Sequence, residues 1–163
     1  MRKRRELKPK VYYHVTAKIS WENYIFEDND VKKLYRNVLK EAKTKFNFTL
    51  KNYIIMANHI HLLIKPHAGN SLSSIMKWIQ QTFACRYNSI YKNKGHVWGD
   101  RFYSVILSCR KRVAQVFKYI ASNSERLQNP IDAKEYQYGG VYEIIRNIFH
   151  VVDPPGFLEM LIE

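Results

Sequence analysis

A short apolar run that contains two histidines constrains the fold of this chain more than any other segment. It reads Met56-Ala-Asn-His-Ile-His-Leu-Leu-Ile64 and stops before Pro66. Successive side chains of a strand point to opposite faces, so His59 and His61 would share one face and the aliphatic residues the other. Two imidazoles on one face can bind one divalent metal ion. The alternatives are a chance pair or two surface histidines on a half-exposed strand.

The residues around this run alternate between strand-like and helix-like patterns. β-branched and aromatic residues predict strands, and apolar residues at helical spacing after Asp28 and Ser71 predict capped helices. The predicted strands are 11–19, 46–57, 59–65 and 101–108, and the predicted helices are 28–45, 71–87 and 111–124. This order predicts an α+β fold of the split βαββαβ, ferredoxin-like kind: an antiparallel sheet with helices on one face, plus one additional helix.

Charge points to a polyanionic partner. The 163 residues include 27 Lys and Arg against 14 Asp and Glu, a net charge of +13, which favours nucleic acid through phosphate neutralisation. A ribosome-associated protein would have the same charge. No apolar run approaches the roughly 20 residues that span a bilayer, so no membrane partner is expected. Cys85 and Cys109 are far apart and form no zinc or disulfide pattern, which is typical of a cytoplasmic protein.

The length suits one domain with short extensions. We expect a basic arm at 1–10, which either contacts phosphates or is simply solvated, a catalytic domain at 11–140, and a tail at 141–163 with one short helix, packed on or extending from the domain.

The last predicted helix carries a second group of polar residues. Tyr119 and Asn123 are four residues apart and therefore share a helical face. An amide oxygen of Asn123 is a suitable third metal ligand, since oxygen donors suit Mg²⁺ or Mn²⁺ and histidines favour Mn²⁺ or later metals. A phenol beside that metal can attack phosphorus. The alternatives are a packing tyrosine and a capping or exposed asparagine. Tyr87 and Tyr91 are rival helical nucleophiles, but neither has an amide four residues on.

Three strings together resemble a known family. Asn58-His-Ile-His-Leu-Leu63, Gly95-His-Val-Trp-Gly-Asp-Arg-Phe102 and Phe117-Lys-Tyr-Ile-Ala-Ser-Asn123 occur in the order found in single-tyrosine HUH transposases, closest to the REP-associated tyrosine transposases. Tyr12-Tyr-His-Val-Thr16 also resembles the first strand of that family. The resemblance covers roughly residues 10 to 140.

The resemblance implies a function and a set of roles. Members cut single-stranded DNA beside hairpins, forming a 5′-phosphotyrosine and a free 3′-hydroxyl that can later rejoin strands. Tyr119 would be the nucleophile, and His59, His61 and Asn123 would bind Mg²⁺ or Mn²⁺. Members are monomers or homodimers. One departure is that Asn123 is followed by Ser-Glu-Arg126, where relatives continue with Pro-Val and a basic residue, so the helix could run further.

A loop and its surroundings are the expected DNA contacts. His96 and Trp98 could stack on unpaired bases and Arg101 could bind a phosphate, or Trp98 could be a core residue and Arg101 an ion-pair partner. A basic rim around this loop is expected from Lys92, Lys94, Arg110, Lys111 and Arg112.

Three functions remain distinguishable by experiment. The first is a metal-dependent single-strand endonuclease and strand transferase. The second is a catalytically inactive hairpin-binding regulator, and the third, without the usual RNA-binding string, is an RNA-binding ferredoxin-like module.

Overall fold

The computed structural model describes residues 7–154, and the first six and last nine residues, parts of the predicted arm and tail, lie outside it. None of the helices in the described part combines the length and apolar character needed to cross a bilayer. The elements are β1 (Tyr12–Lys18), η1 (Ser20–Glu22), η2 (Ile25–Glu27), α1 (Asn29–Lys45), β2 (Phe48–Ile55), β3 (His59–Pro66), α2 (Leu72–Tyr91), β4 (Tyr103–Leu107), α3 (Arg110–Ser122), η3 (Asn123–Arg126) and α4 (Gly140–Arg146), where η marks a 3₁₀ helix.

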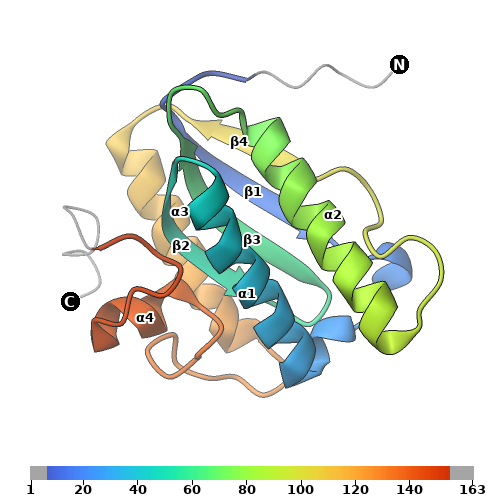
Figure 1. The fold of residues 1–163 in the computed structure, drawn as a ribbon. Coiled ribbons are helices and arrows are strands. Elements are labelled where there is room, and N and C mark those ends of the chain that lie inside the picture. Colours follow the sequence, from blue (N-terminus) through green and yellow to red (C-terminus); the bar gives the residue numbers. More distant parts are fainter. Residues whose placement is uncertain (1–6, 155–163) are drawn as a thin grey trace.

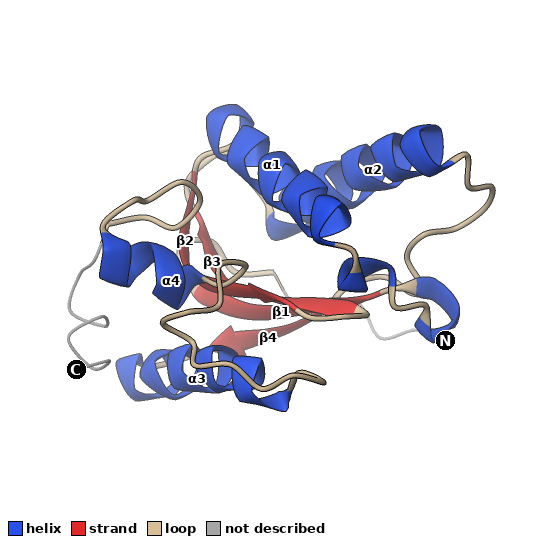
Figure 2. Ribbon diagram, turned by 90° about the horizontal axis from the view of Figure 1, so that it is seen from below, coloured by secondary structure: helices blue, strands red, loops and turns tan. Residues whose placement is uncertain are grey.

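The strands form one antiparallel sheet in the order β2-β3-β1-β4 (Figure 1). Helices α1 and α2 cover one face of this sheet, and α3 lies on the other (Figure 2). The predicted fold class, a ferredoxin-like α+β domain with an additional helix, is therefore confirmed.

The helices begin where the sequence supplies caps. The Asp28 side chain accepts a hydrogen bond from the Asp30 N–H at 2.8 Å, and the Ser71 hydroxyl accepts one from the Ser74 N–H at 3.1 Å. Each cap satisfies a donor that has no partner within its helix. Both caps were expected from the sequence.

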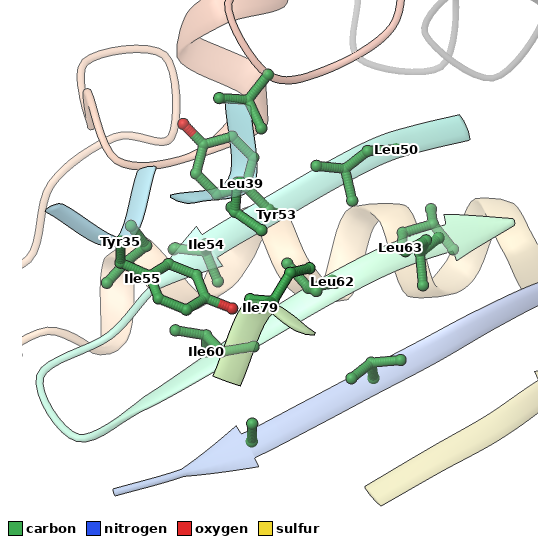
Figure 3. Close-up of a cluster of buried hydrophobic side chains, with 14 of the residues drawn as sticks. Tyr35, Leu39, Leu50, Tyr53, Ile54, Ile55, Ile60, Leu62, Leu63 and Ile79 are labelled. Carbon is green, nitrogen blue, oxygen red and sulfur yellow. The ribbon is translucent and has the colours of Figure 1, made fainter. Parts of the chain in front are cut away.

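The main core lies between the sheet and the pair α1 and α2. Figure 3 shows Tyr35 and Leu39 from α1 and Ile79 from α2 beside the apolar side chains of β2 and β3. In β3 the run Ile60–Ile64 is buried throughout, because α3 covers the second face of this inner strand. Burial on both faces explains why this run is apolar apart from His61.

The strand and helix ends differ modestly from prediction. Strand β4 is shorter than the predicted 101–108 because it pairs only with β1, from Tyr12 opposite Leu107 to Thr16 opposite Tyr103. Helix α3 ends at Ser122 and continues as η3, although no proline follows Asn123. The absence of a proline after Asn123 therefore does not extend the α-helix beyond Ser122.

The segment after η3 packs against the edge strand β2. The Ile55 N–H donates to the Tyr138 carbonyl at 3.0 Å, and the buried Glu143 carboxylate accepts from the Tyr53 hydroxyl at 2.8 Å. A Cβ built on Gly140 would lie 2.5 Å from Asn52 Oδ1, so this contact needs glycine. Division of the chain at residue 140 stays a prediction.

Candidate active site

Two histidines of β3 project from the face of the sheet that α3 covers. The rings of His59 and His61 are 4.9 Å apart between centroids, and His61 is only 5% exposed. The alternation expected from the sequence explains this placement: Ile60 and Leu62 point the other way, into the core with α1 and α2.

The Nδ1 atom of each histidine already has a hydrogen-bond partner. His59 Nδ1 lies 2.7 Å from Asn58 Oδ1, so it carries the proton and donates. His61 Nδ1 lies 2.9 Å from His14 Nε2 and 3.2 Å from Thr16 Oγ1. Both rings thus leave Nε2 as the nitrogen for another ligand. This is the usual arrangement of metal-binding histidines, whose second nitrogen is held by a neighbouring group.

His14 and Thr16 are site residues that sequence reasoning missed. They lie on β1, which pairs antiparallel with β3 so that Thr16 is opposite His61 and Lys18 is opposite His59. The His14 and His61 rings stack with centroids 5.1 Å apart. Alternation within β1 could have shown that His14 and Thr16 share a face, but only the strand register shows that this face contains His61.

Burial keeps these imidazoles neutral. It lowers the pKa of His14, and burial with the nearby charge of Lys18 lowers the pKa of His59. The pKa of His61 falls to about 3, first through burial and then through the other two histidines, Lys18 and Arg126. A neutral imidazole is the form that binds a metal ion.

Tyr119 of α3 lies directly beside the histidines of the same chain. Its ring centroid is 5.7 Å from those of His14 and His61, in edge-on contact with both, and the residue is 39% exposed. Helix α3 is held by buried Phe117, whose carbonyl accepts a hydrogen bond from Asn52 Nδ2 at 3.1 Å. A phenol open to solvent on one side and next to buried imidazoles on the other is accessible to a large substrate.

Asn123 follows one helical turn after Tyr119 and is buried, with 4% exposed. Its Nδ2 donates to the Tyr119 carbonyl at 2.8 Å. Within residues 7–154 no group donates a hydrogen bond to its Oδ1. The amide therefore helps to end α3 and retains an oxygen that can act as an acceptor or a ligand. Its predicted role as a metal ligand stays a prediction.

The donor set fits a divalent metal that accepts nitrogen and oxygen. In the described part of the chain no three His, Cys, Asp or Glu side chains are placed to hold a metal ion together. A metal bound to His59 and His61 therefore needs a ligand of another kind, such as the Asn123 amide, a phosphate oxygen or solvent. Histidine nitrogens favour Mn²⁺ or later metals and oxygen donors suit Mg²⁺ or Mn²⁺, so the identity of the metal stays a prediction.

Arg126 was not predicted as a site residue. Its guanidinium carbon lies 5.3 Å from the centroid of the Tyr119 ring. Arg126 belongs to η3, which continues α3 directly, and it follows Tyr119 by seven residues, about two helical turns. A cation at this position can pair with a phosphate beside the ring.

The expected DNA contacts separate into two groups. Lys92, Lys94 and His96 are exposed after α2, and Arg101 is exposed just before β4. The second group, exposed at the start of α3, consists of Arg110, Lys111 and Arg112. The five residues of β4, about 16 Å of strand, lie between the groups. The two groups thus lie at opposite ends of β4, and their role in binding DNA stays a prediction.

Trp98 occupies a packed position. Its ring contacts Phe26, Tyr35 and Phe83 with centroids 5.5 to 6.4 Å apart, and its Nε1 donates to the Gln80 carbonyl at 2.9 Å. These contacts correspond to the core alternative that the sequence left open.

The rival tyrosines are far from the histidines. Tyr87 and Tyr91 stack on each other at 4.8 Å on α2, which covers the opposite face of the sheet (Figure 2). The Tyr91 hydroxyl donates to Asp28 at 3.3 Å. Of the three tyrosines considered, only Tyr119 adjoins the histidines.

Comparison with known proteins places this arrangement in a family. The family model described as transposase, IS200-like, matches residues 8–123, which include β1, both histidines, Tyr119 and Asn123. The chain belongs to the IS200-like transposase family. The resemblance drawn from the sequence strings is confirmed. No curated protein matches this IS200-like transposase significantly.

Solved structures share its fold. One is a REP-associated tyrosine transposase bound to a REP hairpin, with a TM-score of 0.76, 14% identity and coverage of 97% of this chain and 93% of that chain. A candidate transposase from Deinococcus radiodurans has a TM-score of 0.53, 22% identity and coverage of 74% and 95%. A bacterial tRNA(His) guanylyltransferase-like protein in complex with GTP has a TM-score of 0.53, 16% identity and coverage of 76% and 69%.

Proposed function

We propose that this transposase is a metal-dependent endonuclease and strand transferase that cuts single-stranded DNA beside hairpins through a 5′-phosphotyrosine intermediate. The observation that carries the proposal is the contact of the Tyr119 ring with His61, whose Nδ1 is held by His14. It brings the proposed nucleophile close to a histidine of the same chain whose Nε2 is left for a metal ion.

The covalent step balances without an external energy source. Tyr119 Oη attacks the scissile phosphorus, the bond from phosphorus to the 3′-oxygen breaks, and the phenol proton leaves as the 3′-hydroxyl gains one. The products are a 5′-phosphotyrosine and a free 3′-OH. Attack by another 3′-hydroxyl on the same phosphorus reverses the step and releases the tyrosine.

Each residue of the site has a separate role in the proposed reaction. His59 and His61, with Asn123, would hold a divalent metal that lowers the charge on the attacked phosphate when bound. His14 and Thr16 orient His61 by occupying its Nδ1. A free phenol is mostly protonated at neutral pH, so its proton must leave during the attack, and the nearby Arg126 guanidinium would bind the attacked phosphate.

An aromatic side chain is placed to receive the substrate strand. Tyr103 on the edge strand β4 is opposite Thr16 and is 67% exposed. Residues directly opposite in antiparallel strands share a face, so Tyr103 lies on the histidine side of the sheet. An exposed ring there can stack on an unpaired base next to the scissile phosphate.

A denaturing-gel assay with end-labelled hairpin oligonucleotides tests the proposal. With Mn²⁺, a 3′-labelled strand should stay attached to the protein, whereas a 5′-labelled fragment should be released with a 3′-hydroxyl. Tyr119→Phe and His61→Ala should abolish the adduct, and Tyr91→Phe is the matched control that should keep it. Hairpin binding with no adduct under Mn²⁺ or Mg²⁺ would instead indicate the inactive regulator.

A further inference from the structure

A large basic pocket lies on the same face of the sheet as the histidines, at the other end of α3. Its volume is about 550 Å³, within the usual range of ligand sites. Lys10, Lys51, Lys65 and Arg110 line it, and its described lining contains no Asp or Glu. The positive charges of Lys10, Lys65 and Arg110 favour an anion in the cavity.

The pocket adjoins the candidate active site along β1. Tyr12 lines it and lies two residues before His14, so both side chains point to the same face about 7 Å apart along the strand. Along α3, Arg110 precedes Tyr119 by nine residues, or about 14 Å of helix. A few nucleotides of a bound strand would connect the two places.

The start of α3 adds a second reason for an anion here. The first turn carries Arg110, Lys111 and Arg112, no acidic residue, and the N-cap Cys109 makes no side-chain cap. The N-terminus of a helix has unpaired N–H groups and a partial positive charge, which disfavours cations. Cations in this place are unfavourable in the isolated protein, and an anion bound beside Arg110 in the pocket would offset their repulsion.

We propose that this pocket binds backbone phosphates of the DNA segment next to the scissile phosphate, and so sets the register of the strand on Tyr119. The inference rests on the proposed function, because it takes DNA as the substrate. The pocket residues that would contact the strand are Lys10, Lys65, Tyr12 and Arg110, with Lys51 beside them. Lys65 Nζ lies 4.8 Å above the Tyr12 ring, which holds this lysine at the wall of the pocket.

The salt dependence of binding tests this assignment. Each phosphate contact contributes about one unit to the slope of log K against log salt concentration. We would measure anisotropy of a labelled hairpin oligonucleotide with a single-stranded flank, in the Tyr119→Phe protein with EDTA. Lys65→Gln and Arg110→Gln should each lower the slope by about one unit. Lys77→Gln, exposed on α2 at the opposite face, is the matched control. Equal slopes in all three variants would overturn the proposal.

The two cysteines provide an independent footprint. Both are exposed, and Cys109 lines the pocket whereas Cys85 lies on α2. The hairpin oligonucleotide should slow alkylation of Cys109 by maleimide and leave Cys85 unchanged, while millimolar inorganic phosphate should not protect Cys109. Equal protection of both cysteines, protection of neither, or full protection of Cys109 by free phosphate would contradict the assignment to DNA.

These measurements separate the two proposals. They require binding but no cleavage. A changed slope without any covalent adduct would support the pocket as a DNA site and contradict the proposed nuclease activity. A covalent adduct with unchanged slopes and no footprint would do the reverse.

Discussion

Acidification should destabilise the metal-free protein through His61. Its pKa is about 3 in the folded chain against 6.5 for an ordinary histidine, mainly because the ring is buried. Between these values the unfolded chain binds more protons than the folded chain, so the free energy of unfolding falls as the pH falls. At pH 5, 1.5 units below 6.5, the loss is about 2 kcal/mol at about 1.4 kcal/mol per unit.

The test is urea unfolding at pH 7 and pH 5 with EDTA, followed by circular dichroism. His61→Gln has no imidazole to protonate, so its free energy of unfolding should fall by about 2 kcal/mol less than that of the wild type over this pH interval. The titrating groups that do not interact with His61 are common to both proteins and cancel in the comparison. The same substitution at the exposed His150 is the matched control. Parallel losses in the wild type and His61→Gln would refute the reasoning.

Three further predictions concern how the site is built. A mixture of the Tyr119→Phe and His61→Ala proteins should form no adduct, because Tyr119 contacts His61 of its own chain, and restored adduct would show a site shared between chains. His14→Ala should raise the Mn²⁺ concentration needed for half-maximal adduct formation by about 10- to 100-fold, and His14→Gln should restore part of this loss; a metal titration of the adduct rate measures both. Gly140→Ala should cost about 1–3 kcal/mol in urea unfolding, since its Cβ would meet Asn52 Oδ1 at 2.5 Å, and unchanged stability would contradict that packing.

Local patterns were sufficient to predict the fold. The alternation in β3, the caps at Asp28 and Ser71 and the order of the elements are properties of neighbouring residues, and each appears in the structure. Strand ends were less accurate because they depend on the pairing partner. Strand β4 stops where β1 stops pairing with it.

Non-local contacts explain what the sequence could not show. The role of His14 follows from the register of β1 on β3, which joins residues 47 positions apart. Arg126 contacts Tyr119 because η3 continues the helical path of α3 after Ser122, and the sequence did not show how this helix ends. The basic pocket combines residues from β1, β2, β3 and the start of α3, so no single segment signals it. Conversely, Trp98 lies in a loop-like string, yet its ring packs with residues of α1 and α2.

The most direct test of the central claim is to locate the DNA on the protein by mass spectrometry. Trypsin cleaves after Lys118 and Arg126, which yields the peptide Tyr119–Arg126 with a single tyrosine. After incubation with a hairpin oligonucleotide and Mn²⁺, followed by nuclease and trypsin digestion, this peptide should carry a nucleotide joined through phosphate to Tyr119. An unmodified peptide, or a nucleotide on Tyr91 or another tyrosine, would contradict the account.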